Sequence, residues 1–133
     1  AMEMVAAAKM RKAQFAALSS RPYSTSLNEV ISQIRKKSAQ IQNILLSENN
    51  SPKQIIILVT SDRGLAGGLN INLFRDILRQ EFKDADYITI GRKATQFAAK
   101  TNTNILASFE SEEKSTLDLA RTITKMVTEA FIG

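Results

Sequence analysis

The chain has 133 residues with 18 Lys or Arg, 13 Asp or Glu, a formal net charge of +5, and no Cys, His or Trp. This composition excludes a disulfide framework and a Ser-His-Asp or Cys-His catalytic unit within the chain, and it argues against zinc, haem and iron–sulfur sites. Hydrophobic residues make up 44% of the chain, which excludes disorder throughout.

Two features of the ends and of the apolar pattern limit the cellular context. No apolar run approaches the roughly 20 residues that span a bilayer, and the start of the chain does not have the pattern of a signal peptide. The chain begins with AMEMVAAAK, which has no initiator Met and opens within a helical pattern. We therefore expect a fragment of a longer, cytosolic-type protein.

Charge and glycine are distributed unevenly along the chain. Residues 1–50 carry seven basic and three acidic side chains, whereas residues 51–133 carry eleven and ten. All five Gly lie in the second part, after the polar turn signal at Asn49–Pro52. This shift predicts a helical segment over residues 1–51 and a second domain over residues 52–133.

The first segment has two helical patterns. Residues 2–19 are rich in good helix formers, and Pro22 predicts a kink or an end of this helix. Residues 24–48 repeat aliphatic side chains at steps of three and four, which is typical of a coiled-coil seam. The predicted seam residues are Leu27, Val30, Ile34, Ile41 and Leu45.

The second segment alternates strand and helix patterns. The β-branched run 55–60 predicts a strand that is buried on both faces and central in a parallel sheet. A Gly-rich loop at 61–70, a helix at 71–82, a strand at 87–90, a helix at 92–100, a weak strand at 105–107 and a helix at 114–132 follow. The order predicts an α/β fold with a small, Rossmann-like parallel sheet and flanking helices.

The Gly-rich loop raises the question of phosphate binding. Gly64, Gly67 and Gly68 fit neither GxGxxG nor GxxxxGK[ST], and no Lys follows Gly68. A tight strand-to-helix turn is the favoured interpretation. Asp62 and Arg63 can pair across this turn or face a partner. The remaining carboxylates show no spacing typical of acid–base catalysis or a magnesium site, so we expect no cofactor and no metal.

Basic side chains are concentrated in the first segment. A sequence-independent contact with nucleic acid and a contact with an acidic protein surface both fit this pattern. The segment offers no Trp, and Tyr23 is its single Tyr. The basic residues are Lys9, Arg11, Lys12, Arg21, Arg35, Lys36 and Lys37.

Two stretches resemble the gamma subunit of the rotary F-type ATP synthases. Residues 1–23, AMEMVAAAKMRKAQFAALSSRPY, are similar to the early helix of that family. Residues 58–74, LVTSDRGLAGGLNINLF, are similar to the loop after the first strand of its middle domain. The family commonly has Cys where this chain has Ala66. The resemblance extends loosely over the whole chain.

The resemblance implies an architecture. In the family, the N-terminal helix pairs with a C-terminal helix in an antiparallel coiled coil, and a Rossmann-like domain that binds no nucleotide lies between them. Compared with this pattern, the chain lacks the first helical turns, the remaining strands and the C-terminal helix. We therefore expect a truncated version of that fold.

The resemblance also implies a non-catalytic central stalk, the rotor that couples proton flow through the membrane sector to ATP synthesis or hydrolysis. Its partners would be the alpha and beta subunits of the catalytic hexamer, the epsilon subunit and the c-ring. It would be peripheral on the cytoplasmic face of a bacterial plasma membrane, or on the matrix or stromal face in organelles.

The residues expected to contact partners lie mainly on the first helix. Met2 matches a family position beside an acidic loop of the beta subunit. The full set of expected contacts is Met2, Lys9, Arg11, Lys12 and Arg63. Two alternatives remain from the residues alone: a small nucleotide-binding enzyme and a basic nucleic-acid-binding module.

Overall fold

The structure is a computed structural model that describes residues 1–37, 43–64, 67–82, 84–110 and 116–133. The chain divides into two compact units, Ala1–Ser47 and Glu48–Gly133. Among the described residues, no helix is both long enough and apolar enough to cross a membrane.

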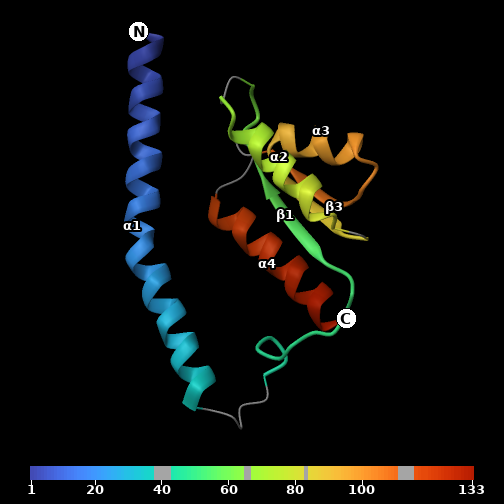
Figure 1. The fold of residues 1–133 in the computed structure, drawn as a ribbon. Coiled ribbons are helices and arrows are strands. Elements are labelled where there is room, and N and C mark those ends of the chain that lie inside the picture. The colour runs from blue at the N-terminus through green and yellow to red at the C-terminus, as the bar shows by residue number, and fades with distance from the viewer. Residues whose placement is uncertain (38–42, 65–66, 83, 111–115) are drawn as a thin grey trace. The chain divides into compact units, whose positions relative to one another are not determined.

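Helix α1 runs from Met2 to Lys37 and includes Pro22. Of the two outcomes predicted at Pro22, a kink or an end, the helix does not end there, because proline removes only one backbone N–H and the flanking residues keep their helical bonds. The hydroxyls of Ser19 and Ser20 donate to carbonyls one turn earlier, at 2.7 and 2.9 Å. Proline and such back-bonded serines bend helices, and the α1 ribbon changes direction near its middle (Figure 1).

A turn at residues 43–47 ends the first unit. The N–H groups of Leu46 and Ser47 donate to the carbonyl of Asn43 at 2.9 and 3.1 Å. The N–H of Leu45 donates to the Asn43 side-chain oxygen at 2.9 Å. The prediction of a helix that continues to residue 48 is therefore wrong, because the Asn43 side chain offers the backbone a competing partner.

The second unit contains a parallel sheet in the order β1-β2-β3. The strands are β1 (Ile55–Val59), β2 (Asp86–Ile90) and β3 (Asn104–Phe109). Each strand is followed by a helix, namely α2 (Leu69–Gln80), α3 (Arg92–Lys100) and α4 (Thr116–Ile132). The predicted alternation of strands and helices is confirmed.

The central strand is β2 rather than β1, so the prediction for the run 55–60 is wrong. Ile57 and Val59 of β1 are 44% and 59% exposed, while Leu58 between them is 2% exposed. In β2, Tyr87, Ile88 and Thr89 are all buried. A continuous apolar run shows that both faces of a strand are apolar, but it does not show how many strands lie beside it.

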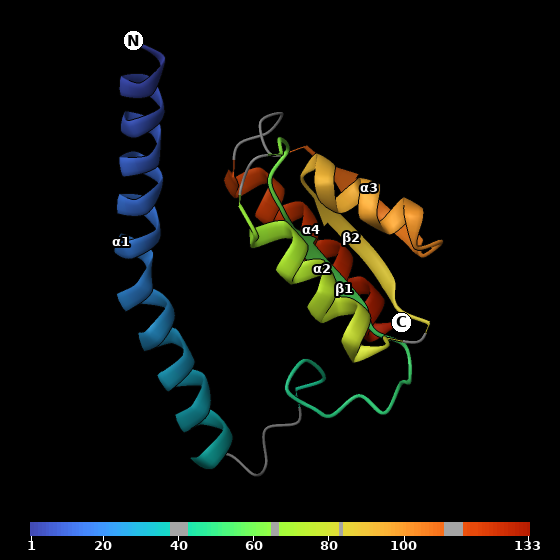
Figure 2. The same ribbon diagram turned by 45° about the horizontal axis from the view of Figure 1, so that its top comes forward.

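Helices cover both faces of the sheet. Ile56 pairs with Tyr87 and Leu58 with Thr89 in the β1–β2 register, so these residues share one face. That face packs against apolar residues of α2 and α3. Helix α4 lies on the opposite side of β1 from α2 in both views (Figures 1 and 2). The second unit thus has helical layers on either side of the sheet.

The main core lies between the sheet and helices α2 and α3. The rings of Phe74 from α2 and Phe97 from α3 stack with centroids 4.2 Å apart. This contact closes the core over Leu58 and Tyr87 of the sheet. The two helices therefore hold each other as well as the strands beneath them.

The apolar residues of α4 and α2 do not all face the core. On α4, Ile123 is buried and Leu119 is half-buried, whereas Leu117 and Ala120 are exposed. On α2, Leu78 is exposed. Both helices carry further apolar residues beside their inward faces. The periodic pattern therefore predicts which residues are buried only to within one position.

Candidate partner-binding surfaces

Helix α1 forms the first candidate surface. None of its residues is buried. Large apolar side chains lie fully in solvent along it, including Met2 at 88% and Phe15 at 76% exposure. Exposed apolar side chains in this density are typical of a surface that binds another protein.

The structure brings three of the predicted contact residues together and separates a fourth. At about 100° per residue along a helix, Met2, Lys9 and Lys12 fall on one face. Arg11 lies on the opposite face, and its Nε donates to the carbonyl of Ala7 at 3.4 Å. All of these side chains are exposed. The fifth predicted residue, Arg63, is exposed in the second unit.

The predicted seam is present on α1 only in part. Leu27, Val30 and Ile34 lie on one exposed face of the helix. Ile41 lies outside the described residues, and Leu45 lies in the turn after the helix, so its assignment to a helical seam is wrong.

The structure adds one residue to this face that the sequence interpretation missed. Ile31 is half-buried, whereas every other side chain of α1 is exposed. The spacing 27, 31, 34 follows the alternating four and three steps of a heptad, and this signal identifies Ile31 without a structure.

The loop after β1 forms the second candidate surface. Its residues Thr60, Ser61 and Asp62 lie at the carboxyl end of β1, beside the first turn of α3. The N–H of Arg92 donates to the Asp62 carboxylate at 2.9 Å, and the N–H of Ala94 donates to the Thr60 hydroxyl at 2.7 Å. These amides are therefore occupied by the protein's own oxygens and not free to receive a phosphate.

Glycine has a defined use in this region at two positions. Gly67 has φ of +59°, with no atom near its missing side chain. Gly91, between β2 and α3, has φ of +101°, and a Cβ there would lie 2.2 Å from the carbonyl oxygen of Thr60. Gly67 thus adopts the positive φ expected of a tight turn, and Gly91, for which the sequence made no prediction, permits a close backbone approach.

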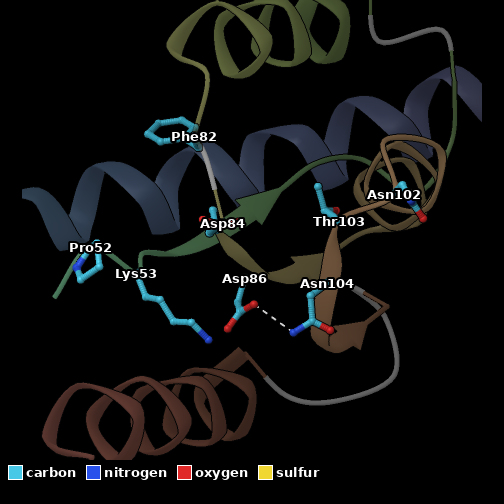
Figure 3. A pocket seen from close by; sticks show the side chains of 9 residues that line it. Pro52, Lys53, Phe82, Asp84, Asp86, Asn102, Thr103 and Asn104 are labelled. Carbon is cyan, nitrogen blue, oxygen red and sulfur yellow. Dashed lines mark hydrogen bonds between the residues drawn. The ribbon is translucent and has the colours of Figure 1, made fainter.

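A cavity of about 500 Å³ lies at the other end of the sheet (Figure 3). It is open and lined by both polar and apolar residues, and in it the Asn104 side-chain amide donates to the Asp86 carboxylate at 2.9 Å. Ligands of parallel α/β sheets bind outside the carboxyl ends of the strands, whereas this cavity adjoins the amino ends of β2 and β3. The cavity therefore does not have the position of a nucleotide site.

The titratable groups that the structure describes in the second unit include an exposed ion pair and a buried tyrosine. Arg92 and Glu110 make an exposed ion pair at 3.9 Å. Within the described ranges, no group of three or more acidic, His or Cys side chains is placed to hold a metal ion. Burial raises the pKa of the Tyr87 hydroxyl above its ordinary value. Tyr87 packs in the core, where a neutral phenol is favoured.

Comparison with known proteins gives matches over the whole chain. The family described as ATP synthase matches residues 1–133. The ATP synthase gamma chain of Opitutus terrae is 36% identical over 132 residues, which cover 99% of this chain and 45% of the relative. The ATP synthase gamma chain of Legionella pneumophila (strain Corby) is 42% identical over 116 residues, covering 83% and 40%. The chain thus spans less than half the length of these relatives.

A solved structure shows the same fold at lower sequence identity. A chain in the OSCP/F1/c-ring structure of the Euglena gracilis mitochondrial ATP synthase, in rotational state 3, superposes with a TM-score of 0.50. The match covers 80% of this chain and 41% of that chain at 14% identity. It supports the arrangement of helices and strands alone.

Proposed function

The chain belongs to the ATP synthase family, and we propose that it is part of a gamma chain, the central-stalk rotor of the F-type enzyme. In this role it couples proton flow through the membrane sector to ATP synthesis or hydrolysis on a hexamer of alpha and beta subunits. The observation that carries the proposal is the family match over residues 1–133, supported by relatives named ATP synthase gamma chain.

The first unit fits the shaft of such a rotor. Its helix has 36 residues and no buried side chain, so its apolar side chains would be available to pack against surrounding subunits. We assign residues 1–51 to this shaft. The face with Leu27, Val30 and Ile34 would pack in a coiled coil, and the face with Met2, Lys9 and Lys12 would contact the hexamer.

The second unit, which we assign to residues 52–133, fits a structural domain that contacts the epsilon subunit and the c-ring. At the described carboxyl end of β1 and β2, Asp62 and Thr60 accept the amides of Arg92 and Ala94, which supports a non-catalytic role without a nucleotide. The chain would then act as a peripheral subunit, on the cytoplasmic face of a bacterial membrane or on the matrix or stromal face in an organelle.

Rotation of an asymmetric shaft provides a mechanism for coupling. Each angular position of the shaft presents different side chains to the three catalytic sites around it. A contact that is more favourable with one conformation of a catalytic subunit shifts that subunit toward it. The two faces of α1, one with Lys9 and Lys12 and the other with Arg11, supply such asymmetry.

The alternatives from the sequence are not favoured. A nucleotide-binding enzyme would need a phosphate-binding Lys in the Gly-rich loop after β1, and no Lys follows Gly68 there. At the start of α3, the amides of Arg92 and Ala94 are occupied by Asp62 and Thr60. A nucleic-acid-binding module would account for the basic residues of α1, but not for the family match over both units.

Cross-linking within the purified synthase tests the proposal. The chain has no Cys, so Lys9→Cys provides a single attachment point for a photoreactive label on α1. We expect cross-links to an alpha or beta subunit. Gln96→Cys, on the exposed side of α3, is a matched control that should give none with these subunits. A complex that contains the chain but shows no cross-link from residue 9 to the hexamer would contradict the proposal.

A further inference from the structure

The loop after β1 supplies the N-terminal capping groups of α3. Gly91 at the N-cap of α3 has no side chain to accept a hydrogen bond. Instead, the Asp62 carboxylate accepts the N–H of Arg92 at 2.9 Å and the Thr60 hydroxyl accepts the N–H of Ala94 at 2.7 Å. Asp62 is 30 residues from Arg92 in the sequence, so this contact joins two loops of the sheet's carboxyl end.

The backbone around these contacts is also closely fitted. The N–H of Lys93 donates to the carbonyl of Ser61 at 3.3 Å, and the N–H of Thr60 donates to the carbonyl of Ile90 at 2.9 Å. A side chain at Gly91 would overlap the Thr60 carbonyl. Three successive residues of the loop thus meet three successive amides at the start of α3.

Arg63 follows these anchored residues directly. Its carbonyl accepts the Ser61 hydroxyl at 2.7 Å, and the Ser61 hydroxyl also accepts the side-chain amide of Asn70 in α2 at 2.8 Å. The Arg63 side chain itself is exposed. The Arg63 backbone is therefore tied to α2 through Ser61 and Asn70, and to the start of α3 through the neighbouring residues of the loop.

We propose that Asp62 is a positioning residue, whose carboxylate fixes the loop so that Arg63 transmits force between the rotor and a partner subunit. The inference rests on the proposed function for the coupling role of Arg63. A carboxylate at a helix N-terminus is favoured by both the free N–H groups and the helix dipole, which explains Asp at this position. Asparagine keeps the acceptor oxygen but not the charge, and alanine keeps neither.

Amide hydrogen exchange on the chain itself tests the anchor. With Asp62→Ala, we expect the amide of Arg92 to exchange about fivefold faster, the effect typical of a lost helix cap. Asp62→Asn should stay close to the parent. Asp76→Ala removes the same charge from the exposed side of α2 and should leave this amide unchanged. An Asp62→Ala variant whose Arg92 amide exchanges like the parent overturns the proposal.

The coupling ratio of the assembled synthase tests the positioning role. Asp62→Ala should lower the number of protons pumped per ATP hydrolysed while ATP hydrolysis persists. Asp62→Asn should keep this number close to that of the parent. Arg63→Ala should lower the ratio equally without changing the exchange of the Arg92 amide. Faster exchange with an unchanged coupling ratio overturns the proposal. The presence of the chain in the purified parent synthase is checked before any substitution is made. If the chain is absent from it, the proposed function itself is contradicted.

Discussion

Helix α1 and strand β2 show opposite relations to solvent, although both are rich in apolar residues. The 36 residues of α1 include no buried side chain. In β2, Tyr87, Ile88 and Thr89 are consecutive and buried at 3%, 0% and 0% exposure. The difference shows that apolar content alone does not indicate where a core lies, and that the two units depend on different sources of stability.

The second unit carries its own core, whereas no side chain of α1 in the first unit is buried. Burial of a Leu, Ile or Val side chain stabilises by about 1.5–3 kcal/mol when it is complete. This gain is available to the second unit on folding. For α1 it would depend on the subunits proposed to surround it, so substitutions in the two units should affect different measurements.

The largest expected effect is at the junction of β2 and α3. Gly91→Ala forces a Cβ against the Thr60 carbonyl, at 2.2 Å, and places Ala at φ of +101°. Steric overlap and backbone strain together should destabilise the second unit by roughly 3–5 kcal/mol. Urea unfolding followed by circular dichroism measures this loss.

Gly64→Ala is the matched control for this substitution. The nearest atom to its added Cβ would be Cε of Lys93 at 3.9 Å, the end of a flexible side chain. We expect a change within about 1 kcal/mol. Equal unfolding midpoints for the Gly91→Ala variant and the parent would show that the close approach at Thr60 does not hold in solution.

A second prediction compares the two units directly through one residue type. Ile88→Ala removes a side chain that is fully buried in β2 and should cost about 3 kcal/mol of unfolding free energy. Ile34→Ala removes the same atoms from α1, where the side chain is 40% exposed. In the chain alone, we expect it to change the urea unfolding of the second unit by less than about 0.5 kcal/mol.

In the assembled synthase, Ile34→Ala should have a larger effect than it has in the chain alone, because Ile34 would then be covered. Retention of the chain in the complex on washing with salt or urea measures the contribution of α1. Loss of more than about 1 kcal/mol from the second unit by Ile34→Ala would contradict the separation of the two units.

Much of the second unit is predictable from local pattern. The α3 bounds, Arg92 to Lys100, agree with the sequence prediction because Gly91 and the turn at Thr101 delimit a short helix. The position of β1 at the edge is not predictable, because its apolar run is the same for an edge and a central strand. That property depends on which strands pair, which is a long-range result.

For the candidate surfaces, too, local features are predictable from the sequence and long-range contacts are not. Helical spacing alone places Lys9 and Lys12 on one face and Arg11 on the other. The sequence left both a kink and an end open at Pro22. Helix α1 continues there because the favourable propensity on both sides outweighs one lost hydrogen bond. The contact of Asp62 with Arg92 spans 30 residues and leaves no local signal beyond a Gly-rich turn.

The smallest expected effect concerns the core residue Tyr87 at high pH. Burial raises the pKa of its hydroxyl in the folded chain above the ordinary value of 10.0. In the unfolded chain the same hydroxyl ionises at the lower, ordinary pKa, so raising the pH through about 10 stabilises the unfolded state first. The stabilising contribution of the neutral, buried hydroxyl is fully present below that pH and is lost as the pH rises through the folded pKa.

The Tyr87→Phe variant lacks the hydroxyl, so its unfolding free energy should fall less than that of the parent between about pH 9 and pH 11, by roughly 1 kcal/mol or less. Tyr23→Phe, at an exposed position on α1, should follow the parent. Urea unfolding at several pH values measures the difference, and parallel curves for Tyr87→Phe and the parent would show that the buried hydroxyl does not account for the alkaline loss.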